Sequence, residues 1–136
     1  MAKYDAYGTA LKLDGTAFAQ VRNISGPGLS LDTEDVTAHD STGAWEEVVG
    51  TILRSGEITL DLVYDPAAAT HKYAAGGLLG ILAGRAADEY TLVFPDAATT
   101  TWTFNAFVTG FEPSAPHDGA LTASVTFKLT GSITLV

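Results

Sequence analysis

The residues from Trp102 to Val136 carry the clearest indication of the fold. It opens as Trp-Thr-Phe, continues from Phe107 as Phe-Val-Thr-Gly-Phe-Glu-Pro-Ser-Ala-Pro, and resumes at Leu121 as Leu-Thr-Ala-Ser-Val-Thr-Phe-Lys-Leu-Thr-Gly. Apolar and polar residues alternate with a period of two on both sides of a Pro-, Asp- and Gly-containing turn. One face collects the apolar residues Trp102, Phe104, Ala106, Val108, Leu121, Ala123, Val125, Phe127 and Leu129. The other face is largely Thr, Ser and Asn, which is typical of an antiparallel sheet packed on one face only.

The rest of the chain predicts further strands and one helix. Strand-like stretches cover residues 7–13, 18–24, 29–36, 57–64 and 90–94, with a short edge piece at 133–136 and a tight turn at Asp14-Gly15. Asp65-Pro66 is typical of a helix start. The helix would run to about Ala83 with Gly84 as its cap, and its buried stripe would be Ala75, Leu78, Leu79 and Leu82. We therefore expect a mainly β single domain over residues 1–136: an antiparallel β-sandwich or partly closed barrel with one α-helix packed outside.

Composition excludes several classes of function. The 136 residues include no cysteine, so neither a thiolate metal site nor a cysteine nucleophile exists. The net charge is −9, from 16 acidic and 7 basic residues, and the basic residues are scattered along the chain. Tight sequence-independent DNA binding needs clustered Lys and Arg, so a DNA-binding protein is not expected. The N-terminus has no apolar segment of the kind that a signal peptide carries, and no stretch predicts a membrane span.

No motif predicts an enzyme, a metal site or a cofactor. His39, Asp40 and Ser41 have the residue types of a catalytic triad, but adjacent residues cannot form a triad among themselves. The three histidines have no metal-ligand spacing. An acidic cluster lacks the glycine that a calcium loop requires, and a solvated acidic face is its better interpretation; its members are Asp32, Glu34, Asp35 and Asp40.

The segment from His39 to Leu53 breaks the periodicity. It is longer than most structureless loops in compact domains, and it carries more apolar residues than a solvated loop needs. Trp45 would either fold back into a small local core or anchor a partner. We expect the segment to order against a neighbouring subunit, and deletion of residues 44–50 to spare the fold but abolish assembly. Trp45 and Trp102 together leave open a second class, a monomeric carbohydrate-binding β-sandwich module, although Trp102 lies on an apolar strand face.

Four stretches, in this order, resemble the major tail tube protein of siphophages, the long-tailed, non-contractile phages that include lambda-like ones. They are Gly8-Thr-Ala-Leu-Lys-Leu-Asp-Gly, the run Ile24-Ser-Gly-Pro-Gly-Leu-Ser-Leu-Asp-Thr-Glu-Asp-Val-Thr-Ala-His-Asp-Ser, Gly56-Glu-Ile-Thr-Leu-Asp-Leu-Val-Tyr-Asp-Pro and Phe111-Glu-Pro-Ser-Ala-Pro. The resemblance covers nearly the whole chain, and it rests on the ordered set because no single motif is diagnostic. It implies the tube domain only, without the additional C-terminal immunoglobulin-like domain that some members carry. A tube or ring protein of a secretion system is the nearest alternative.

The resemblance also implies partners and surfaces. Copies would form hexameric rings that stack around a tape-measure protein, with tail terminator and baseplate or initiator proteins at the ends; the subunit would be made in the host cytoplasm and end in the virion. The expected contact surface between rings is His39, Asp40, Trp45, Glu46, Glu47, Val48, Val49 and Ile52. Candidates for the wall of the lumen, past which DNA would move without specific binding, are Asp32, Glu34, Glu57, Thr59, Asp61, Thr122, Ser124 and Thr126.

Overall fold

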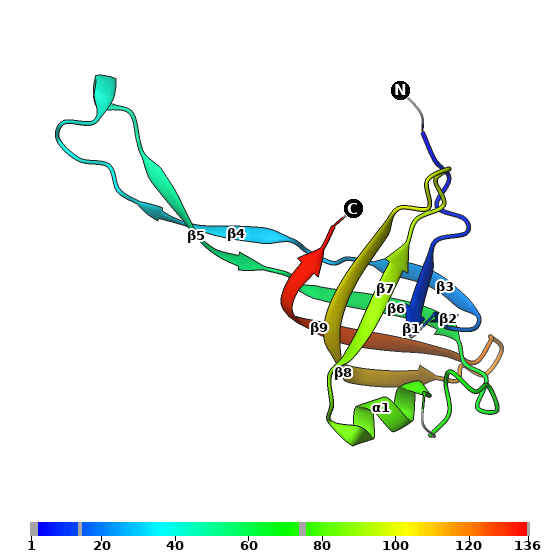
Figure 1. Cartoon of the computed structure of the whole chain (residues 1–136). Coiled ribbons are helices and arrows are strands. Elements are labelled where there is room, and N and C mark those ends of the chain that lie inside the picture. The colour runs from blue at the N-terminus through cyan, green and yellow to red at the C-terminus, as the bar shows by residue number, and fades with distance from the viewer. Residues whose placement is uncertain (1–2, 14, 74–75, 136) are drawn as a thin grey trace.

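Two long strands, β8 (Thr101–Ser114) and β9 (Thr122–Thr134), form the centre of the fold, as the alternation predicts. The computed structural model describes residues 3–13, 15–73 and 76–135. The other elements are β1 (Ala10–Leu13), β2 (Thr16–Ala17), β3 (Val21–Ser25), β4 (Ser30–Asp35), a 3-10 turn η1 (Thr42–Ala44), β5 (Val48–Arg54), β6 (Glu57–Val63), α1 (Leu78–Gly84) and β7 (Asp88–Val93). The expected mainly β fold with one helix is confirmed (Figure 1).

One seven-stranded antiparallel sheet curls around the core. Its strand order is β2-β1-β7-β8-β9-β6-β3, so β2 and β3 are its two ends and the barrel is partly closed. β8 joins the two halves of the sheet, because its residues 101–106 pair with β7 whereas most of its pairs with β9 lie beyond residue 105. Breaks in register on β8, between Thr103 and Asn105 and between Val108 and Gly110, occur where the sheet bends. Figure 1 shows β7 and β1 crossing in front of β6, β9 and β3.

The core lies inside this curl. Alternate residues of the central strands point inward and are almost completely buried, including Leu60, Tyr90, Phe104, Val125 and Phe127. The helix α1 closes the core from outside through Leu78, with Ile81 and Leu82 packed beside it. The second tryptophan of the chain, Trp102, also packs against the core, edge-on to the ring of Phe94 with their ring centroids 5.1 Å apart.

The expected helix is much shorter than the sequence pattern predicts. α1 begins at Leu78, and the residues after Asp65-Pro66 form successive turns; the Asp65 carboxylate accepts a hydrogen bond from the Ala67 amide at 3.0 Å. Gly76 has a φ of 83°, which ends any helix that reaches it from the N-terminal side. The left-handed residue at the C-terminal end is Arg85, with φ 56°, and not Gly84. Asp14, Ala75 and Val136, which belong to the expected turn, stripe and edge piece, lie outside the described residues.

His71 explains why these turns replace a helix. Its side chain is fully buried, and its Nε2 lies 2.7 Å from the carbonyl oxygen of Ala19 while its Nδ1 accepts the Asp65 amide at 3.2 Å. The neighbouring Thr70 hydroxyl accepts the Ala19 amide at 3.1 Å. The turn segment therefore bonds to both backbone groups of Ala19, directly beside the buried ring of Phe18, and this seals one end of the core.

Replacing His71 with alanine should lower the free energy of unfolding by about 2 kcal/mol, because the Asp65 amide and the Ala19 carbonyl would lose their partner in a partly buried site. Chemical denaturation of the free subunit measures this. The exposed His117 supplies the matched control, since His117→Ala should change stability by less than about 0.5 kcal/mol. Equal effects of the two substitutions would contradict the anchoring role.

Candidate assembly surfaces

The chain between β3 and β6 forms an arm that leaves the body. β4 and β5 pair only with each other, as a separate two-stranded sheet, and Figure 1 shows this hairpin projecting far from the curled sheet. We define the arm as Leu29–Arg54. None of its residues is buried, and its exposed large apolar residues are Leu29, Leu31, Val36, Trp45, Val48, Val49, Ile52 and Leu53. Exposed apolar surfaces of this kind usually mark a site of interaction, so we interpret the arm as an element that contacts another chain.

The two faces of the arm differ. Leu31 pairs with Leu53, Thr33 with Gly50 and Asp35 with Val48, and directly paired residues share a face. Leu53, at 81% exposed, is the most open apolar residue of this face. The opposite face carries charge, with Asp32 bound to Arg54 by an ion pair of 2.8 Å. The face of Leu31 and Leu53 also carries Asp35, whereas the opposite face combines the ion pair with the exposed Val49, which pairs with Glu34.

Polar contacts close the tip of the arm. The Glu47 amide donates to the Thr37 hydroxyl at 2.8 Å, and the Ser41 hydroxyl donates to the Glu47 carboxylate at 2.9 Å. The Asp35 carboxylate accepts the Thr37 amide at 2.8 Å, and the hydrogen bonds from Thr37 hold the pKa of Asp35 below its ordinary value. These bonds shape the tip and leave the indole of Trp45 exposed at 76%. Trp45 forms no local core, which removes one of the two alternatives for it.

The segment 39–53, which breaks the periodicity and is expected as a loop, includes part of a strand. Val48–Arg54 is a strand, and the sequence pattern hid it because β5 has an extra residue between its pairs at Gly50 and Leu53. A strand with neither face buried is also not constrained to alternate apolar and polar residues. All eight residues expected at the contact between rings lie on the arm, but Glu47 forms hydrogen bonds within the tip itself. Leu31 was absent from that expectation, and its pairing with Leu53 could be found only from the structure.

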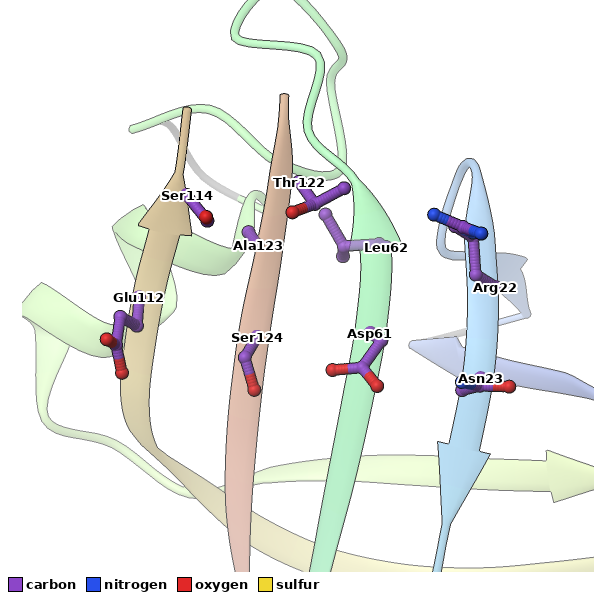
Figure 2. Close-up of a pocket in the computed structure, with 9 residues that line it drawn as sticks. All are labelled: Arg22, Asn23, Asp61, Leu62, Glu112, Ser114, Thr122, Ala123 and Ser124. Atoms are coloured by element: carbon purple, nitrogen blue, oxygen red, sulfur yellow. The ribbon is translucent and has the colours of Figure 1, made fainter. Parts of the chain in front are cut away.

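The second surface is the solvent-facing side of the half-sheet β3-β6-β9-β8. A row of directly paired residues crosses these four strands, consisting of Asn23, Asp61, Ser124 and Glu112. Figure 2 shows this row, with Arg22 near one margin and Glu112 at the other. The row lines a shallow groove of about 450 Å³ together with Ser114 and Thr122. We call this surface the polar face.

Six of the eight lumen candidates lie together on the polar face: Glu57, Thr59, Asp61, Thr122, Ser124 and Thr126. The other two, Asp32 and Glu34, lie on β4 of the arm and share no surface with the six. The polar face also carries both signs of charge. Glu57 is paired directly with Lys128, and Arg22 lines the groove with Asp61. Three carboxylates, counting Glu112, against two cations give the face a net charge of −1.

The described residues show no arrangement suited to catalysis. No three His, Asp or Glu side chains among them gather where they could hold a metal ion. His71 is committed to backbone partners, and Ser41 is committed to Glu47. No helix in the described part of the chain is long and apolar enough to cross a membrane. The exposed arm and the polar face are instead features of a protein that assembles with other chains.

A family model described as phage tail tube protein matches residues 11–135. The chain therefore belongs to the phage tail tube protein family, which is structural and has its place in the tail tube of the virion particle. No curated protein matches the chain by sequence.

Solved structures share the fold over the full chain. A chain from the virion of a native gene transfer agent particle is 20% identical with a TM-score of 0.76, and the match covers 98% of this chain and 99% of that one. A chain from the tail of the empty gene transfer agent particle, refined with C6 symmetry, is 19% identical with a TM-score of 0.75 and the same coverage of both chains. A chain from the sheath/tube terminator of an extracellular contractile injection system is 15% identical with a TM-score of 0.76, covering 100% of this chain and 98% of that one. At these identities the likeness establishes the fold alone.

Proposed function

We propose that this protein is the subunit of a non-contractile phage tail tube and that it assembles into hexameric rings stacked around a tape-measure protein. The observation that carries the proposal is the arm, because it places Trp45 and Leu53 in solvent at 76% and 81% exposure. Large apolar side chains on a projecting element are typical anchors of an interface. The arm of each copy would pack on the adjacent ring. The six-fold symmetry of a tail with the same fold supports a hexamer, and terminator and baseplate proteins would end the stack.

The polar face would line the lumen. DNA carries roughly one negative charge per 1.7 Å of its axis, so a strongly cationic wall would hold it through counterion release. The face is rich in hydroxyl groups and nearly neutral, with Lys128 beside Glu57 and Arg22 near Asp61. A hexamer as a whole would carry 6 × −9 = −54. The genome would therefore move past this wall without specific binding.

Negative-stain electron microscopy of the concentrated protein tests the assembly. Hollow tubes or stacked rings are the expected result, and a reconstruction at side-chain resolution should show Thr59 and Thr126 facing the lumen. Particles that remain monomeric at millimolar concentration, also in the presence of a tail initiator complex and tape-measure protein, would contradict the proposal.

Thr59→Lys combined with Thr126→Lys should turn the wall into a DNA trap. The two residues are directly paired, so each hexamer would gain 2 × 6 = 12 positive charges inside the lumen. Tubes should still form, and they should retain short duplex DNA at low salt in a form that nuclease cannot reach. The matched control is glutamine at both positions, which adds length without charge. Retained DNA that nuclease digests fully would place the polar face outside the tube.

The fold by itself does not separate a phage tail from an extracellular contractile injection system, since chains from a gene transfer agent particle and from such an injection system both share it. The four ordered sequence stretches favour the siphophage tube, and a secretion-system tube is the runner-up. A carbohydrate-binding module has little support because Trp102 packs against Phe94 and the core, which leaves Trp45 as a single exposed aromatic at the tip of the arm. Co-purification with a long helical tape-measure protein would separate the phage tail from these alternatives.

A further inference from the structure

Two short linkers connect the arm to the body of the subunit, and their backbones lie against each other. Residues 26–29 join β3 to β4, and only Ser55 and Gly56 join β5 to β6. The Gly56 carbonyl also accepts a hydrogen bond from the Leu129 amide of β9 at 3.2 Å. Among the described strands, β4 and β5 pair only with each other, so the direction of the arm depends on how these linkers pack (Figure 1).

Two glycines allow the linkers to approach this closely. Gly56 has a φ of 74°, and a Cβ atom there would lie 2.5 Å from the carbonyl oxygen of Gly28. Gly26 has a φ of 102°, and a Cβ atom there would clash with the carbonyl oxygen of Glu57, the first residue of β6. At both positions a left-handed backbone coincides with a lack of space, so any other residue would force the linkers apart. We define the glycine junction as Gly26, Gly28 and Gly56.

The arm is tied across its two strands just beyond this junction. The extra residue of β5 lies here, and the Thr51 hydroxyl donates to the Asp32 carbonyl oxygen at 3.1 Å. The Asp32 carboxylate binds the Arg54 guanidinium at 2.8 Å. These bonds hold β4 and β5 together across the bulge, so a tilt at the glycine junction is passed on to the rest of the arm.

A small tilt would be enough to misplace the tip. Ser30–Asp35 spans roughly 20 Å at about 3.3 Å per residue. A change of about 10° at the glycine junction would therefore displace the far end of this strand by roughly 3.5 Å. That displacement is about the full contact distance between two carbon atoms. The core of an interface is packed as densely as a protein interior, so it would not tolerate such a shift.

We infer that the glycine junction fixes the direction of the arm before assembly, and that Gly26 and Gly56 are positioning residues for the contact between rings. The free subunit then already presents Trp45 and Leu53 in the direction that stacking requires. An element that is ordered in advance loses less conformational freedom when it binds, which favours association. This inference rests on the proposed tube function and deepens it, because it names the residues that prepare the arm for its partner.

Distance measurement by double electron–electron resonance tests the inference in the unassembled subunit. The chain has no cysteine, so Asp40→Cys at the tip and Thr59→Cys on β6 would carry the only two spin labels; both positions are exposed. The parent background should give one narrow distribution of distances. Adding Gly26→Ala or Gly56→Ala should shift its mean or at least double its width. A broad distribution in the parent background would overturn the inference without any glycine variant.

The yield of tubes supplies the second readout. Gly26→Ala and Gly56→Ala should each lower it at least tenfold, with the circular dichroism of the parent retained. Gly28→Ala is the matched control, because a Cβ atom at Gly28 meets open space. It should leave the yield within twofold and the label distances unchanged.

Three outcomes would contradict a positioning role for the glycine junction. They are normal tube yields from both Gly26→Ala and Gly56→Ala, lost tubes with unchanged label distances, and loss of the parent circular dichroism, which would assign these glycines to the fold of the body. In all three cases tubes of the parent chain would still support the proposed function. A parent chain that never assembles would refute that function, whereas its label distances would still test the junction.

Discussion

A variant that lacks the arm, with Gly28 joined directly to Ser55, is expected to fold as the parent does and to form no tubes. The junction is short because the backbone of Gly28 already touches Gly56, where a Cβ atom would lie 2.5 Å from the Gly28 carbonyl oxygen. The deletion turns β3 and β6 into a simple hairpin and keeps their pairing from Val21 to Ser25. No buried residue is lost, since none of the residues from 29 to 54 is buried.

Two measurements separate folding from assembly in this variant. Its far-ultraviolet circular dichroism, corrected for the missing strands, and its thermal midpoint should match those of the parent. Electron microscopy should show no tubes, and sedimentation should show nothing larger than a single ring, because the deletion removes the proposed contact between rings. A milder variant, Trp45→Ala with Leu53→Ser, keeps the arm and should reduce tube yield at least tenfold. Normal tubes from the deletion variant would refute the role of the arm.

Phe127→Ala is expected to have the largest effect on stability. The ring of Phe127 is fully buried at the centre of the curl, with ring centroids 5.1 Å from Tyr90 and 6.1 Å from Phe18. Truncation of such a ring removes its burial and leaves a cavity that the surrounding strands cannot fill, which costs about 3–5 kcal/mol. The total free energy of unfolding of a domain of this kind is only about 5–15 kcal/mol. The thermal midpoint should therefore fall by roughly 10–20 °C.

Phe107→Ala is the matched control for this prediction. Phe107 lies across from Lys128 on the polar face and is 39% exposed, so its truncation in the free subunit should cost less than about 1 kcal/mol. Urea unfolding of the two variants under identical conditions gives the difference. If Phe127→Ala lowers the free energy of unfolding by less than about 1 kcal/mol, or if both variants lower it equally, the core does not lie where the alternation predicts it.

The central strands could be predicted from sequence because their environment imposes a simple pattern. Residues of β8 and β9 alternate between core and solvent, so Phe104, Val125 and Phe127 identify the buried face without any structure. The arm lacks this constraint, since neither of its faces is buried within the subunit. β5 was therefore missed, although the excess of apolar residues near Trp45 correctly marked the segment as unusual.

Long-range contacts account for the other differences between the structure expected from the sequence and the one observed. Asp65-Pro66 has the local signal of a helix start, but His71 binds the backbone of Ala19, some fifty residues away, and holds the segment in turns. The local sequence pattern does not predict that contact. In the same way Asp32 and Glu34 alternate as Glu57 and Asp61 do, yet the first two lie on the arm and the last two on the polar face.

Residue types and their periodicity were enough to predict the mainly β class, the buried face of the long strands, the absence of thiol chemistry, and a resemblance that the family match confirmed in its general form. These properties depend on residue type and on periodicity within one element, and both are local. The folded chain was needed to show how the sheet curls, where the arm leaves it, and that Arg22 and Glu112 lie at opposite margins of one face. Those features arise from pairing between distant strands, from breaks in register and from backbone contacts, which no local pattern encodes.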